Sequence, residues 1–317
     1  MTLAEDIKRK ALQLGFDLVG ITTAGPIDSH QVELLARWLK SGCDGQMNYM
    51  RRNFQKRINP AALLDGARSV ICIGLNYRPE PAKKMPKGAV PTGRVAVYAQ
   101  YEDYHLFMKK QLRKLAVFLN FIVGPALKFK ICVDSAPLAE RALAVRAGLG
   151  FIGRNHMLIN PRLGTQIFLG EIITNLELKP DEPAEQDCTN CQRCLAACPT
   201  AAIGLDGSFD ANRCISYLTI EHEDRISPDL AEKIGDRLFG CDECVLACPY
   251  QEAGPVCKSK QFKFYRDRAG LNLKEILDLS QDDFGTKFAD SAIKRLGFER
   301  LKRNARICLA NLGAQRA

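Results

Sequence analysis

Hydrophobic and polar positions in the first half of the chain switch repeatedly between helical and strand patterns. Residues 3–14 form an amphipathic, charged segment, and Thr2 and Glu5 have the spacing of a capping box at a helix N-terminus. Apolar runs predict strands at 18–23, 70–77, 130–133 and 166–178, and further helical patterns cover 105–121 and 137–148. This alternation predicts an α/β (α+β) domain over about residues 1–180.

The second half of the chain has a different character. A proline-containing linker at 180–185 leads into a cysteine-rich region at about 181–257, and a basic helical tail is expected at 258–317. Four prolines and three lysines in residues 78–93 predict a mobile loop. No stretch approaches 18 uncharged apolar residues, and the N-terminus lacks the apolar run of a secretion signal. We therefore expect a cytoplasmic protein without a membrane span, with a monomer as the default.

The charge balance indicates which binding partners the chain could attract. The 317 residues carry a formal net charge of +9, which attracts polyanions such as nucleic acid or an anionic membrane. Cations gather at residues 51–57, 109–114 and 294–306. These clusters could supply phosphate contacts or form ordinary solvated helix faces, and charge alone leaves both interpretations open.

Thirteen cysteines are many for a chain without a secretion signal, and eight of them fall within 61 residues. This concentration favours metal binding over a disulfide scaffold. The first run, Cys188-x2-Cys191-x2-Cys194-x3-Cys198-Pro, has the full spacing of a bacterial ferredoxin. In that arrangement three cysteines in a tight loop bind one [4Fe–4S] cluster, and the fourth binds the other cluster.

The second run, Cys241-x2-Cys244-x3-Cys248-Pro, lacks one cysteine of its loop, and Cys214 can supply it. The spacing therefore predicts two [4Fe–4S] clusters, one bound by Cys188, Cys191, Cys194 and Cys248 and one by Cys198, Cys214, Cys241 and Cys244. Zinc is the weaker alternative, because zinc sites use paired CxxC units without the proline-terminated cysteine. The isolated cysteines, Cys43, Cys72, Cys132, Cys257 and Cys308, are expected to be small buried side chains.

Three other motifs are candidates for binding or catalytic chemistry. Residues 148–153 match GxGxxG but follow a helical run, which is typical of glycine caps at a helix end. His105 stands where some cobalamin enzymes have a cobalt-binding histidine, but the motif fails at Met108, so a structural role is expected. Asp134 ends an apolar strand and could donate a proton as a carboxylic acid with a raised pKa, or could cap the following helix.

Motifs spread along the chain resemble those of the epoxyqueuosine reductases over nearly its whole length. The resemblance is carried by residues 56–60, 103–105, 133–141, 147–155, 170–175, 187–194, 213–219 and 240–244. It implies a cobalamin-binding domain fused to a bacterial-ferredoxin-like domain with two clusters and a short helical tail. It also implies reduction of epoxyqueuosine to queuosine at the wobble base of tRNA, with base-off cobalamin receiving electrons through the clusters.

The resemblance also implies roles for individual residues. Asp134 falls on the proposed proton donor of the family. Nine residues fall on segments that line the cobalamin: Arg57, Asp134, Asn155, His156, Met157, Leu158, Leu169, Ser216 and Asp242. The expected partners are tRNA with a queuosine-type anticodon and a low-potential electron donor such as a flavodoxin or ferredoxin.

Two other functions remain as alternatives. A reductive dehalogenase shares the cobalamin and cluster plan, but those enzymes usually carry a twin-arginine signal, which this N-terminus lacks. A ferredoxin-type electron-transfer protein with a large accessory domain would bind no cobalamin. Some family members also place a cysteine near cobalt just before the motif at 103–105, whereas this chain has Arg94-Val-Ala-Val-Tyr98 there.

Overall fold

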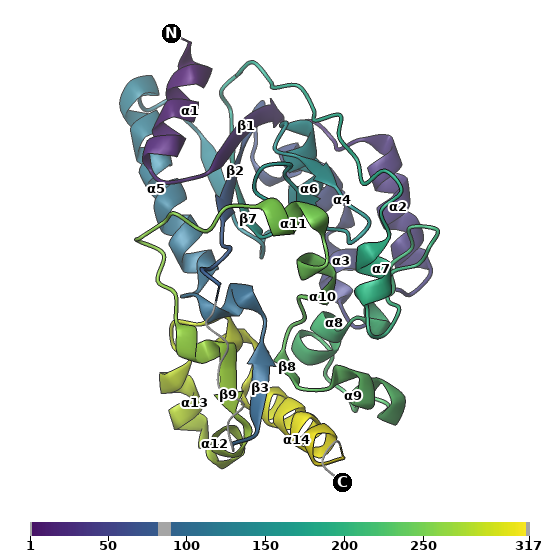
Figure 1. The fold of residues 1–317 in the computed structure, drawn as a ribbon. Helices are drawn as coiled ribbons and strands as arrows, with labels where there is room; N and C mark the ends of the chain where they lie inside the picture. Colours follow the sequence, from purple (N-terminus) through teal and green to yellow (C-terminus); the bar gives the residue numbers. More distant parts are fainter. Residues whose placement is uncertain (1, 82–89, 315–317) are drawn as a thin grey trace.

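The computed structural model describes residues 2–81 and 90–314, so residues 82–89 of the loop predicted at 78–93 lie outside it (Figure 1). The first part of the fold is a sheet of four strands in the order β1-β2-β7-β4. Their bounds are β1 Leu18–Thr23, β2 Ser69–Asn76, β4 Phe129–Cys132 and β7 Ile167–Thr174. Every neighbouring pair in this sheet is antiparallel. The predicted mixture of helices and strands is confirmed, and the pairing makes the domain α+β.

Helices cover both faces of this sheet. On one face α1 (Leu3–Gln13) and α5 (Tyr104–Val123) share a buried core with Ile71 and Ile73 of β2. On the other face α6 (Glu140–Arg146) packs against a core that contains Val70 and Cys72. Successive strand residues point to opposite faces, so one fully buried strand serves both cores. Three helices follow β1: α2 (Ser29–Lys40), α3 (Asn48–Arg52) and α4 (Phe54–Ile58).

The close approach of α6 to the sheet depends on a glycine. A Cβ atom placed on Gly20 would lie 2.0 Å from the carbonyl oxygen of Ala147. Only a residue without a side chain allows this contact. Gly20 therefore fixes how closely the C-terminal end of α6 can approach β1.

A second hydrophobic core lies below the first sheet in Figure 1. Its short sheet has the order β8-β3-β9, with β3 (Thr92–Val95) parallel to β8 (Arg237–Phe239) and antiparallel to β9 (Gly270–Asn272). The surrounding helices are α8 (Ile215–Ile220), α9 (Pro228–Ile234), α12 (Leu273–Asp278), α13 (Gln281–Lys287) and α14 (Phe298–Ala314). The segment predicted as a helical tail thus adds a strand, and its helices contribute buried residues such as Leu301 and Ala305 to this core.

The cysteine-rich region lies between the two cores. It contains α7 (Arg193–Ala197), α10 (Glu243–Leu246) and α11 (Pro249–Ala253), and α7 lies against α10. A small hairpin of β5 (Phe151–Ile152) and β6 (Leu158–Ile159) approaches them from the first domain. Among the described residues, no helix is both long enough and apolar enough to cross a membrane.

Candidate functional site

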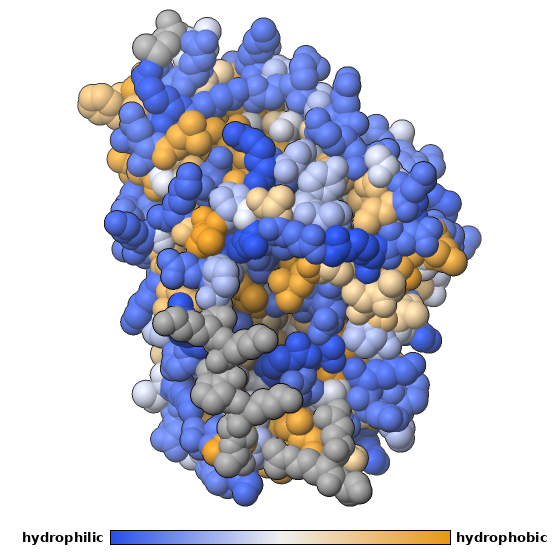
Figure 2. Space-filling view, in the orientation of Figure 1, coloured by the Kyte–Doolittle hydropathy of each residue, from blue (hydrophilic) through white to orange (hydrophobic). Residues whose placement is uncertain are grey.

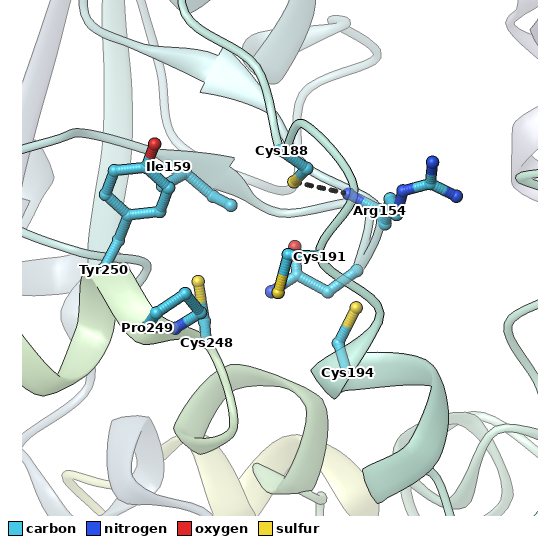
Figure 3. Close-up of a pocket in the computed structure, with 9 residues that line it drawn as sticks. Arg154, Ile159, Cys188, Cys191, Cys194, Cys248, Pro249 and Tyr250 are labelled. Carbon is cyan, nitrogen blue, oxygen red and sulfur yellow. Dashed lines mark hydrogen bonds between the residues drawn. The ribbon is translucent and has the colours of Figure 1, made fainter.

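Four of the predicted cluster ligands line one cavity. Cys188 and Cys191 come from the loop that leads into α7, Cys194 lies in the first turn of α7, and Cys248 comes from the junction between α10 and α11 (Figure 3). The backbone N–H of Arg154 donates a hydrogen bond to Sγ of Cys188 at 3.4 Å. Four thiols facing one space, with an amide donor to sulfur, match the requirements of a cubane cluster.

The proline after the last cysteine of each run has a visible effect. Cys198 ends α7 with extended backbone, and Cys248 has the same conformation immediately before Pro249, the first residue of α11. Proline fits the first position of a helix, where its missing N–H is not needed. Each break in the helix turns its cysteine away from the preceding cysteines and toward the other group.

The other four predicted ligands also come together. Burial raises the pKa of the Cys244 thiol, and Cys214, Cys241 and Cys198 raise it further through their charges, which places these three close to Cys244. Cys214 precedes α8, and burial raises the pKa of Cys241 to about 11. Thiols kept so far from ionisation need a cation to become thiolates, so this site suits an iron cluster.

Three of the predicted cobalamin contacts lie beside this second cysteine group. Asn155 donates from Nδ2 to the carbonyl of Cys244 at 3.2 Å, and Ser216 lies on α8 two residues after Cys214. Asp242 lies between two of the cysteines and accepts the N–H of Val97 at 2.6 Å. Burial raises the pKa of Asp242 to about 6.

Asp134 follows β4 and has a left-handed backbone, with φ of +54°. Its Oδ2 lies 2.9 Å from Nε2 of His105 at the start of α5, and Nδ1 of His105 lies 2.6 Å from Oδ1 of Asp103. Arg295 contacts the same His105 nitrogen, and its guanidinium lies 3.8 Å from the Asp134 carboxylate. The His105 side chain is 8% exposed, whereas that of Asp134 is 53% exposed, so Asp134 is the accessible end of this chain of groups.

The electrostatics correct one expectation about Asp134. Burial raises its pKa, but the hydrogen bond and charge of His105, with Tyr104 and Arg295, outweigh burial and hold that pKa below its ordinary value. Burial lowers the pKa of His105, yet Asp103 and Asp134 raise it on balance. The prediction of a raised carboxylic-acid pKa was therefore wrong for this arrangement, because the shared proton resides on the imidazole.

The ion pairs around His105 give a testable pH dependence. His105→Gln should lower stability by about 2 kcal/mol. The imidazolium contribution is complete below its ordinary pKa of 6.5 and is lost as pH rises through the higher folded value. The Asp103 and Asp134 contributions are complete above 3.8 and are lost as pH falls through their lower folded values. The Tm gap between wild type and variant should therefore be widest between about pH 4 and 6.5, and a pH-independent gap would contradict the assignment.

The remaining predicted cobalamin contacts flank the Asp134 loop. Nε of Arg57 and Nε2 of His156 are buried donors or acceptors without a hydrogen-bond partner among the described residues. Met157 donates its N–H to Oδ1 of Asn155 at 3.2 Å. Leu158 is buried in the core beneath α6, and Leu169 of β7 packs against that core. Two unpaired polar atoms in one region fit a large ligand with hydrogen-bonding groups at its edge.

Sequence reasoning missed several residues that face Asp134. His105 was expected to be structural, and the failed motif at Met108 hid its pairing with Asp134. Burial raises the pKa of Tyr49 on α3 to about 12, and the nearby carboxylates of Glu221 and Asp134 contribute to this rise. Arg295 comes from a part of the chain 161 residues beyond Asp134. No local pattern marks these residues, because tertiary packing brings them together.

Two protein-family models match this chain, one in the first domain and one in the cysteine-rich region. The family model for epoxyqueuosine reductase QueG, DUF1730, matches residues 57–135, and a model for a 4Fe-4S double cluster binding domain matches residues 187–251. The chain is 36% identical over 310 residues to an epoxyqueuosine reductase from Vibrio cholerae, covering 98% of this chain and 83% of the relative.

Solved structures of this type are also similar. An epoxyqueuosine reductase solved with an epoxyqueuosine-modified tRNA-Tyr stem loop superposes with a TM-score of 0.90, 32% identity, and coverage of 98% of this chain and 81% of the other. An epoxyqueuosine reductase from Bacillus subtilis, with its catalytic loop swung out of the active site, gives a TM-score of 0.89 at 31% identity, covering 98% and 81% of the two chains.

Proposed function

The chain belongs to the epoxyqueuosine reductase family and is an oxidoreductase, and from this premise we propose how it converts epoxyqueuosine in tRNA to queuosine. Similarity along 98% of the chain carries the proposal. The conversion replaces an epoxide by a carbon–carbon double bond and releases the oxygen as water. It consumes two electrons and two protons, so the protein must supply both.

Electrons are proposed to enter through the two cysteine groups. Cys188, Cys191, Cys194 and Cys248 bind the first cluster, and Cys198, Cys214, Cys241 and Cys244 bind the second. The second group lies beside Asn155, which donates to the carbonyl of Cys244 and is one of the proposed cobalamin contacts. The first cluster is therefore proposed as the outer one, which accepts electrons from a low-potential flavodoxin or ferredoxin.

We propose base-off cobalamin as the redox cofactor between the second cluster and Asp134. Bound cobalamin supplies a reducible cobalt centre that can deliver electrons to the substrate. The unpaired polar atoms of Arg57 and His156 support this assignment, since they would hydrogen-bond to groups at its edge. Asn155 and Asp242, beside the second cysteine group, would contact it from the other side, together with Ser216, Met157, Leu158 and Leu169.

The proton is proposed to come from the His105–Asp134 pair. His105 holds it at Nε2, hydrogen-bonded to Oδ2 of Asp134, and Asp134 is the member that faces the accessible side. Asp134 takes this proton from His105 and passes it to the leaving epoxide oxygen, which leaves Asp134 ionised and His105 neutral; the second proton needed to release water comes from solvent. Asp103 holds the imidazole from behind and stabilises its charged form.

The tRNA is proposed to bind next to Tyr49. Arg52 and Lys56 are exposed on α3 and α4, the same short helices that carry Tyr49 and Arg57. They can contact phosphates, while the exposed ring of Tyr49 can stack on an unpaired base. Arg303 of α14, another member of the basic clusters, instead donates to the carbonyls of residues 218, 222 and 224 and so supports the fold.

Anaerobic turnover tests the whole proposal. Protein reconstituted with iron, sulfide and cobalamin, and supplied with a low-potential reductant, is expected to convert epoxyqueuosine-containing tRNA to queuosine-containing tRNA, as measured by mass spectrometry of its nucleosides. The same tRNA without cobalamin is the control. An absence of cobalamin binding would contradict the cofactor assignment. We place the reaction in the cytoplasm, where tRNA is modified.

A further inference from the structure

A pair of glutamates lies behind the loop that carries Asp134. Glu171 is in the middle of β7 and is 1% exposed. Glu140 is the first residue of α6, six residues after Asp134. The proton path described above uses neither residue. Buried carboxyl groups are costly unless they are paired or protonated, so these two need a physical explanation.

The surroundings of Glu171 cannot neutralise a negative charge. Its neighbours on the adjacent strands are Cys72 of β2 and Cys132 of β4, which face the same side of the sheet. Both thiols are protonated at neutral pH, because burial and then the charge of Glu171 raise their pKa values. One carboxyl oxygen of Glu171 has no partner among the described residues. The partner of Glu171 is Glu140, to which it is hydrogen-bonded.

Glu140 connects this buried residue to the Asp134 loop. Its Oε1 accepts the backbone N–H of Asp134 at 2.5 Å. Burial, and then the charge of Glu140, raises the pKa of Glu171, and burial followed by the charge of Asp134 raises that of Glu140 to about 7. A carboxyl–carboxylate pair with one proton satisfies these contacts, since Glu171 can donate its O–H while Glu140 accepts from both sides.

The backbone at Asp134 needs such support. Its φ of +54° lies in the left-handed region, which is strained for a residue other than glycine. The strain persists only where the surroundings hold the residue in place. The exposed side chain contributes contacts to His105, and the amide contact to Glu140 fixes the backbone itself. In the similar Bacillus subtilis structure, the catalytic loop is found swung out of the active site.

We propose that Glu140, held by its hydrogen bond to Glu171, is a positioning residue that keeps the Asp134 backbone in the conformation presenting its carboxylate to the substrate. This inference rests on the proposed function only in the role it gives to Asp134. The amide contact and its effect on loop order are properties of the protein without substrate. Glu140 therefore acts through Asp134 and needs no contact with the substrate or cofactor.

The test combines hydrogen exchange with kinetics in the reconstituted holoenzyme. Glu140→Ala removes the acceptor and should speed exchange in peptides covering residues 130–139 by about tenfold or more. It should lower kcat by on the order of 10²-fold with KM changed less than about twofold, because substrate contacts remain while the donor is misplaced. Glu140→Gln retains a carbonyl oxygen for the Asp134 amide and should recover most of both properties.

Two further variants separate positioning from general damage. Glu171→Gln can still donate a hydrogen bond to Glu140 and should leave loop exchange near the wild-type rate. Glu33→Ala, on the exposed side of α2, is the matched control and should change neither measurement. If Glu140→Ala leaves loop exchange unchanged, the positioning role is wrong. If exchange rises in Glu140→Ala but no wild-type turnover of epoxyqueuosine-tRNA is found, the proposed function fails while the structural role stands.

Discussion

Replacing Asp134 with asparagine should slow turnover of epoxyqueuosine-tRNA by about 10²–10⁴-fold while both clusters remain bound. Asparagine has nearly the same shape and tolerates a left-handed backbone, so φ of +54° can be kept. It cannot carry the acidic proton or pair with the charged form of His105. Cluster content, measured as iron per chain, should equal that of the wild type, since Asp134 contacts no cysteine of either predicted cluster in the described structure.

Asp65→Asn is the matched control for this change. The Asp65 side chain is fully exposed and, within the described part of the chain, forms a long ion pair, 3.9 Å from Lys128. It loses the same charge without touching His105, so its turnover should remain at the wild-type rate. Normal turnover by Asp134→Asn would show that another group delivers the proton. Its pH–rate profile would then identify that group by the pKa that controls the rate.

Replacing Cys214 with alanine should remove the second cluster and abolish turnover, while the first cluster survives. Cys214 is the ligand that lies outside both regular cysteine runs, so it tests the pairing directly. Its loss leaves Cys198, Cys241 and Cys244 with three corners of a cubane. Iron and sulfide should fall by about half, and the reduced protein should show the paramagnetic signal of a single cluster.

Cys43→Ala is a demanding control for Cys214→Ala. The carbonyl oxygen of Cys43 accepts the N–H of Ala211 at 2.9 Å, so this cysteine lies on a segment adjoining the loop before Cys214. It is also half-buried, as Cys214 is. If Cys43→Ala lost a cluster while Cys214→Ala retained full iron, Cys43 and not Cys214 would be the cluster ligand. Full cluster content in both variants would contradict the four-cysteine assignment of the second site.

The extent to which the sequence predicts the structure depends on how local each signal is. The helix at 3–14 and the strand at 18–23 were predicted closely, because capping spacing and apolar runs are local patterns. The strand at 237–239 was missed, because three residues carry too little periodicity. Antiparallel pairing was not predicted, because pairing is decided between strands far apart in the chain.

The same distinction applies to the site. Cysteine spacing indicated both quartets, since the reach of a short loop limits which thiols can share a cluster. The state of Asp134 was misjudged, because its pKa depends on His105 and Arg295, which no neighbouring residue signals. The Glu140 contact was also invisible in the sequence, where this residue is only the first residue of a helix. Electrostatic roles arise from distances in space, which linear patterns do not encode.

The position of β3 between β8 and β9 also constrains the order of events during synthesis. All four strands of the first sheet have emerged from the ribosome once residue 174 is exposed, so that sheet can form early. The strand β3 is made after β1 and β2 and before β4 and β7, but its two partners end at residues 239 and 272. One edge of β3 therefore remains unpaired until residue 239 is made and the other until residue 272, nearly 180 residues after β3 ends, and an unpaired edge invites association with other chains. The risk of aggregation during translation is therefore highest until residue 272 has been added, because only then is the last partner strand of β3 complete.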